Sequence, residues 1–236
     1  MLRRLMFASL LVALGTPAPG ATHDLRKATG LFTPSFRGAA MHTTWTGWQT
    51  FGVGGFGTPI VNQPSDLGDD PGTWQTTNGE DHTPFSSNFY SFTGAVAEDL
   101  TLPTDGTVGA GFTTVIVQAL ALAFGGSGEF PRELLFADIG GLAPTEVLQT
   151  TNANGIGQVW AKYELPGNEP SLTVSISTAL DNSHVAIDRL TVDTLWSPTG
   201  YAPDTAIASP EPLAATLTLL GLGGLLASRG LFKTHQ

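Results

Sequence analysis

The chain has 236 residues, with 10 Lys and Arg against 20 Asp and Glu and a formal net charge of −10 at pH 7. Such an excess of carboxylates repels a phosphate backbone, which excludes nucleic acid as a partner. The absence of Cys excludes disulfides, thiol catalysis and lipoprotein acylation. The length that remains without the two end segments suits a single domain with its own core.

Residues 1–21 have the pattern of a secretory signal peptide. Arg3 and Arg4 precede an apolar run from Leu5 to Leu14, and a stretch rich in small residues, Thr16–Ala21, follows it. An apolar run of about ten residues is too short to cross a bilayer of roughly 30 Å. We therefore expect export and cleavage near Ala21 in preference to an uncleaved anchor.

Residues 22–205 are predicted to form one β-sandwich domain. Aromatic and Thr-containing runs at Trp45–Phe51 and Asn88–Phe92 have strand character. The intervening segment, Gly52–Pro84, is rich in turn residues and predicts a long loop with one short strand at Trp74.

The segment Phe112–Phe124 is compatible with a helix or a strand. Its Ala/Leu half suits a helix, whereas its β-branched start and flanking glycines favour a strand, which we expect. Val159–Leu165 alternates apolar and polar residues and stops at the turn pair Pro166–Gly167, so it predicts a strand with a defined end.

The clearest strand pattern is Leu172–Leu180, where apolar and hydroxyl side chains alternate. Val185–Ile187 continues in the same way, but the apolar parity changes at Leu190–Trp196, which predicts a β-bulge near Asp188–Arg189. Many short strands and little helical pattern indicate an all-β fold. We expect an antiparallel two-sheet sandwich, jelly-roll-like, between an N-terminal signal peptide and a C-terminal hydrophobic helix.

A cluster of acidic residues is the best metal candidate in the chain. Asp66, Asp69 and Asp70 stand in one short segment and could supply hard oxygen ligands to Ca²⁺. The alternative is a solvated acidic turn without an ion. None of the five His residues belongs to a recognised zinc-binding pair, and we expect no cofactor.

The sequence offers no compact catalytic motif. The adjacent carboxylates Glu80–Asp81 and Glu98–Asp99 would point to opposite faces of a strand, so neither pair forms a glycosidase dyad. Gly126–Gly128 lacks the nucleophile elbow of a serine hydrolase. We expect a protein that is not an enzyme, with a glycoside hydrolase built from distant carboxylates as the weaker alternative.

Three tryptophans are candidates for carbohydrate contact. Trp45, Trp48 and Trp74 could form an aromatic platform for sugar rings, while burial in the core is the competing interpretation.

Residues 206–236 have the order of a sorting signal. Ser209–Pro212 precedes the apolar run Leu213–Ala227, and the basic residues Arg229 and Lys233 follow it. Three glycines in the run would weaken a soluble helix by about 1 kcal/mol each, so we expect a membrane helix. The basic residues would then lie on the cytoplasmic side.

Pro210, Glu211 and Pro212, the apolar run and Arg229 together resemble the PEP-CTERM sorting signal of bacterial surface and exopolysaccharide-associated proteins. The resemblance implies recognition and removal by an exosortase-type processing enzyme, with transient anchoring in the inner membrane. Asn88–Phe92 and Leu172–Trp196 also resemble uncharacterised extracellular sandwich domains that precede such signals.

These patterns together predict a secreted, non-enzymatic cell-surface or extracellular-matrix protein with a structural or adhesive role. The alternative is a carbohydrate-binding module that uses the Trp45–Trp74 region and has polysaccharide as its partner.

Overall fold

A computed structural model describes residues 20–38, 41–51, 59–77, 89–91, 96–123, 134–151, 156–178 and 185–207. Most of the predicted signal peptide lies outside these ranges, as do the residues predicted to form the sorting signal, Pro210, Glu211, Pro212 and Arg229. Within them the chain is built of strands, and the one helical element is the 3₁₀ turn η1 (Leu25–Lys27).

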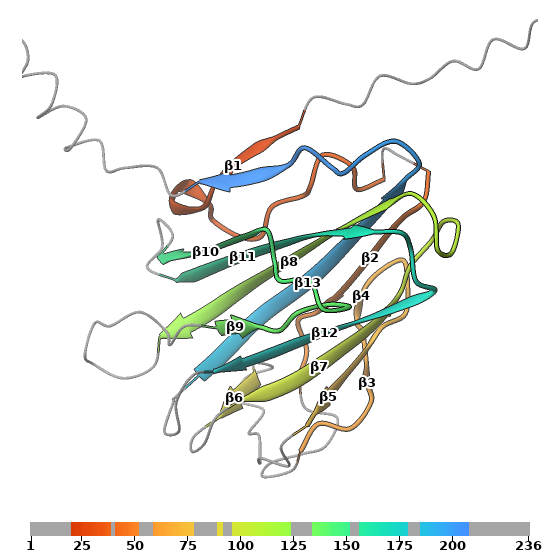
Figure 1. Ribbon diagram of the computed structural model, residues 1–236. Helices are drawn as coiled ribbons and strands as arrows, with labels where there is room; N and C mark the ends of the chain where they lie inside the picture. The colour runs from red at the N-terminus through yellow and green to blue at the C-terminus, as the bar shows by residue number, and fades with distance from the viewer. Residues whose placement is uncertain are drawn as a thin grey trace, which may run out of the picture.

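The strands form an antiparallel two-sheet sandwich (Figure 1). The order in the larger sheet is β10 (Glu146–Thr151), β11 (Gly157–Pro166), β8 (Phe112–Ala123), β13 (Val185–Ser197), β2 (Thr43–Trp48) and β4 (Leu67–Gly68), with β6 (Phe89–Ser91) also paired to β13. The order in the smaller sheet is β3 (Gln63–Pro64), β5 (Thr73–Thr76), β7 (Ala97–Pro103), β12 (Ser171–Thr178) and β9 (Leu134–Phe136).

A third, smaller element consists of β1 (Thr22–Asp24) and β14 (Thr205–Ile207), which pair in parallel. This pair joins the start of the domain to its end, because Thr22 lies opposite Thr205 and Asp24 opposite Ile207. Residues before β14 and around η1 cover the outer face of the larger sheet, where they form a second apolar cluster with Ile116 and Trp160.

The predicted all-β sandwich is confirmed. The chain crosses repeatedly between the two sheets, and the last long strand, β13, lies between β2 and β8, which is the jelly-roll-like feature of the topology. The strands expected at Phe112–Phe124, Val159–Leu165 and Leu172–Leu180 are present as β8, β11 and β12. The predicted bulge is present as a register shift between Ile187 and Arg189.

Two predictions need correction. The described part of Gly52–Pro84 contains three short strands, β3, β4 and β5, where one was expected. Two of them have two residues each, too few for any alternation to be visible in sequence. The fold also extends past the expected domain end at residue 205, since β14 continues to Ile207.

The core between the sheets is aromatic at one end. The rings of Trp48 and Trp74 meet edge to face at 5.7 Å, and the Phe51 ring packs against Trp74 at 5.0 Å. Both tryptophans are 0% exposed, and the Trp74 indole N–H donates to Glu98 at 2.6 Å. The prediction that Trp48 and Trp74 contact glycans is therefore wrong, because ring pairing and burial in the core occupy both side chains.

Candidate functional site

The outer face of the larger sheet carries an unusual concentration of buried polar side chains. Strand alternation places Gln118 of β8, Lys162 of β11 and Asp193 of β13 on this face, away from the core between the sheets. In a two-layer sandwich these side chains would meet solvent. Here they are 0%, 5% and 0% exposed, respectively.

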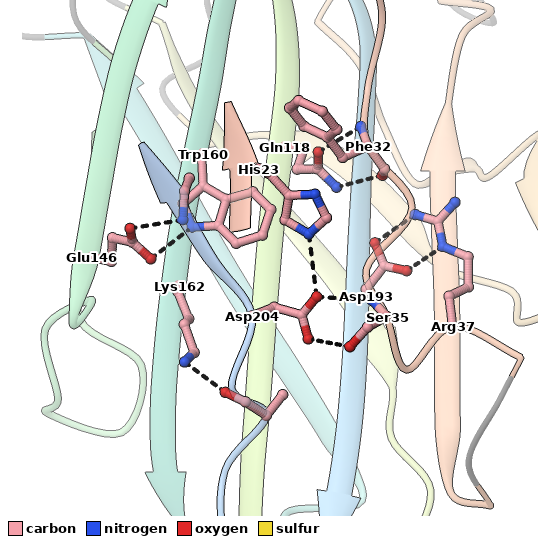
Figure 2. A network of polar contacts seen from close by, with 12 residues as sticks. His23, Phe32, Ser35, Arg37, Gln118, Glu146, Trp160, Lys162, Asp193 and Asp204 are labelled. Carbon is pink, nitrogen blue, oxygen red and sulfur yellow. Dashed lines mark hydrogen bonds and ion pairs between the residues drawn. The ribbon is translucent and has the colours of Figure 1, made fainter. Parts of the chain in front are cut away.

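Two segments from opposite ends of the domain cover this face, residues 22–37 and residues 202–206. We call the polar contacts that fasten them to the sheet and to each other the terminal clamp (Figure 2). The side chains that make it are His23, Ser35, Arg37, Gln118, Glu146, Lys162, Asp193 and Asp204.

Asp204 is the centre of the clamp. Its Oδ1 lies 3.2 Å from His23 Nε2 and accepts the backbone N–H of Ser35 at 2.8 Å. Its Oδ2 accepts the Ser35 hydroxyl at 2.6 Å. Asp204 is 0% exposed and His23 is 7% exposed, so this carboxylate joins two parts of the N-terminal segment to the C-terminal segment away from water.

These contacts set the protonation of Asp204. Burial alone raises the pKa of a carboxyl group, but the hydrogen bonds from His23 and Ser35 outweigh it. The net result is a pKa of Asp204 below its ordinary value of 3.8. The carboxylate is therefore held in its charged, acceptor form.

A second ion pair ties the N-terminal segment to β13. Arg37 donates through Nε to Asp193 Oδ1 and through Nη2 to Oδ2, the latter at 2.6 Å, a two-pronged arrangement that suits guanidinium. The guanidinium also stacks over Trp45, 4.4 Å from the ring centroid. Burial raises the pKa of Asp193, and the hydrogen bonds and charge of Arg37 oppose that rise.

The remaining clamp residues form hydrogen bonds with the backbone of the two covering segments. The Gln118 side-chain amide both donates to the Phe32 carbonyl and accepts from the Phe32 N–H, each at 2.9 Å. Lys162 Nζ donates to the Ala202 carbonyl at 2.7 Å. Glu146 Oε1 accepts the Ala206 N–H at 2.9 Å. Sheet side chains thus pair the backbone groups of Phe32 and Ala202, which lie outside any strand, and of Ala206, which lies in the two-stranded β1–β14 pair.

The clamp leaves some neighbouring groups unpaired. The Gln158 side-chain amide and the Thr191 hydroxyl are buried on the same face without a hydrogen-bond partner, as is Nε of Arg189. Each such group costs about 1–3 kcal/mol relative to a paired one. The segments that cover this face therefore contribute less to the free energy of unfolding than their hydrogen bonds alone would indicate.

The grouping of Ser, His and Asp is not a hydrolase triad. In a triad the imidazole contacts the nucleophile and orients toward the carboxylate on its other side. Here the Ser35 hydroxyl and the His23 ring both bind the Asp204 carboxylate, so the hydroxyl donates its proton to a carboxylate oxygen. These hydrogen bonds fasten the N-terminal segment to the C-terminal segment.

The predicted site residues lie elsewhere. Trp45 is half-buried on the outer face, and its indole N–H donates to Asp69 at 3.0 Å. Asp70 accepts the Trp45 backbone N–H at 3.3 Å and Asp66 accepts that of Gln49 at 2.9 Å. The three carboxylates thus bind β2 and the residue after it. In the described ranges no group of three His, Asp or Glu side chains is placed to hold a metal ion.

Sequence reasoning missed the clamp itself. A usable signal was present in β8, because Gln118 interrupts an apolar run, and in β11, because the apolar Trp160 stands on the face of the alternating strand that also carries Lys162. A polar residue at such a position indicates a specific partner once the strand is known to be buried on both faces.

Replacing Asp204 with Asn tests the clamp through pH. Asp204→Asn should lower the free energy of unfolding at neutral pH by about 1.5–3 kcal/mol, the typical worth of hydrogen bonds to a charged group. The native pKa lies below the ordinary one, so this advantage of the wild type is complete above pH 3.8 and disappears as the pH falls through the native pKa. Urea unfolding of both proteins at several pH values measures it. A difference that does not depend on pH would contradict a charged Asp204.

The Arg37–Asp193 pair is suited to a double-mutant cycle. Arg37→Met should destabilise the domain by about 3–5 kcal/mol, because it leaves a buried carboxylate without its partner. The double variant Arg37→Met/Asp193→Leu should regain most of that loss. Unfolding in urea gives all four free energies. Additive losses would show that the two side chains act independently.

The described residues contain no helix that could serve as a membrane span, and the run Leu213–Ala227 lies beyond them. Comparison with protein-family models, with curated proteins and with solved structures finds no match for the chain.

Proposed function

We propose that the chain is an exported β-sandwich that an exosortase-type enzyme sorts to the cell surface or the extracellular matrix. Its role there is structural or adhesive, without catalysis. The observation that carries the proposal is the sequence Pro210–Pro212, followed by the apolar run Leu213–Ala227 and Arg229. Exopolysaccharide is the setting that the resemblance to PEP-CTERM proteins implies.

The fold is compatible with removal of both ends. The first strand begins at Thr22, directly after the expected signal-peptide cleavage near Ala21, and the last strand ends at Ile207, before the Pro-Glu-Pro tripeptide. Cleavage at either position would break no strand pairing of the sandwich. The terminal clamp then holds both new ends of the mature domain against the larger sheet.

A carbohydrate-binding role has one remaining observation in its favour. Trp45 is the one member of the expected platform that is not fully buried, and Arg37 and Asp69 lie beside its ring. An indole flanked by charged hydrogen-bonding groups suits a sugar ring. This alternative uses Trp45 alone.

The sorting proposal is tested by the intact mass and the C-terminal peptide of protein recovered from its native cells. A mature chain that begins at Thr22 and ends near Pro210–Pro212 is the expected result. The variant Glu211→Gln is the matched control and should retain the full tail, because it alters the tripeptide and leaves the apolar run unchanged. A wild-type chain that still carries Arg229–Gln236 would contradict sorting by cleavage.

The carbohydrate alternative is tested by retention on polysaccharide columns. Trp45→Ala should keep the fold, since the side chain lies outside both apolar clusters, and should lose retention. Asp69→Asn keeps an acceptor beside the indole N–H and serves as a comparison. Equal retention of wild type and Trp45→Ala, or retention of neither, would remove the hypothesis.

A further inference from the structure

The turn η1 lies where the chain leaves the domain. Asp24 pairs with Ile207 in the parallel β1–β14 pair, here called the parallel ribbon, and η1 starts at the next residue, Leu25. Figure 1 shows the blue arrowhead of β14 beside the red turn of η1. Ile207 is 46% exposed at this end.

This turn is also the exposed basic site of the described chain. Arg26 and Lys27 are the only exposed Lys or Arg residues in the described ranges. The Lys27 side chain is 76% exposed, and its ion pair with Asp24 at 3.1 Å is of the weak, solvent-screened kind. Arg26 uses Nε to donate to Thr150 at 3.4 Å, and its terminal nitrogens have no contact of this kind within the described residues.

The segment between β14 and the apolar run is short, so a membrane that contains the run would lie close to η1. Between Ile207 and Leu213 the chain advances six residues, which span at most about 20 Å when fully extended. With Leu213–Ala227 inserted as proposed above, the end of the domain that carries η1 stays within about 20 Å of the hydrocarbon boundary, close enough to reach the lipid headgroups. The turn between β7 and β8, which carries Asp105, lies at the other end of the sandwich (Figure 1).

We propose that η1 is a membrane-docking surface, in which Arg26 and Lys27 bind the phosphate groups of anionic phospholipids while the domain is anchored. The inference rests on the proposed membrane segment. Two charges would bind a vesicle weakly on their own, but tethering makes docking intramolecular and raises the effective lipid concentration. Attraction of a basic residue to an anionic leaflet shifts the ratio of docked to undocked domain roughly fivefold per charge.

The absence of Cys allows a site-specific proximity measurement on the full exported chain. Thr29→Cys places a fluorophore at an exposed position beside η1, and Val108→Cys places one at the distant β7–β8 turn, where the native side chain is 60% exposed. The protein is bound to vesicles of phosphatidylcholine with or without phosphatidylglycerol that carry a headgroup quencher. A C-terminal histidine tag on chelator lipid keeps the domain tethered whether or not Leu213–Ala227 inserts.

The label at residue 29 should be quenched more than the label at residue 108, and only in anionic vesicles. Arg26→Gln and Lys27→Gln should each lower the docked-to-undocked ratio roughly fivefold. The control Thr107→Asp makes the same change in net charge at an exposed position of the distant β7–β8 turn and should leave the ratio unchanged. Equal quenching of the two labels, equal quenching in both lipids, or insensitivity to both substitutions would overturn the inference.

A separate experiment tests whether the apolar run inserts: extraction of the untagged chain from membranes at alkaline pH. Failure of the proposed membrane segment is thereby distinguished from failure of the docking surface.

Discussion

The structure depends on the burial of β8 on both of its faces. One face packs into the core between the sheets, and the other lies under the two terminal segments, so Thr113 to Ala121 are all buried. Burial of a polar side chain there is tolerable only with a partner. Gln118, Lys162 and Asp193 meet that requirement by binding the covering segments, whereas Gln158 and Thr191 do not. The terminal clamp is thus a condition for a sheet with two buried faces.

Local patterns predicted the long strands because their period extends over many residues. The ambiguity at Phe112–Phe124 was of physical origin: a strand buried on both faces loses the alternation that distinguishes it from a helix. The parallel ribbon could not be predicted in this way. Its strands have three residues each, and the contact between His23 and Asp204 spans 181 positions.

The candidate site was predicted less well than the fold. Aromatic residues near one another in sequence suggested a platform, yet alternation within β2 sends Trp48 inward and Trp45 outward. The acidic segment suggested cation binding, and its carboxylates instead accept N–H groups of β2 and the residue after it. In both cases the residue type suggested a ligand, a sugar for the tryptophans and a cation for the carboxylates. The folded chain instead supplies internal partners for these side chains. The segment predicted to be a sorting signal differs, because that prediction rests on the linear order of its residues alone.

The unpaired groups beneath the cover bear on how the domain opens. Water can satisfy Gln158 and Thr191 when the N-terminal segment lifts, which offsets part of the free energy that breaking the clamp requires. The covering layer is therefore expected to open in a sub-global step at a lower free energy than the sheets beneath it. Amide hydrogen exchange would then separate two cooperative units within one domain. The outer unit would contain both ends of the described domain, residues 22–37 and 202–206, so a protease could gain access to them while the sandwich stays folded.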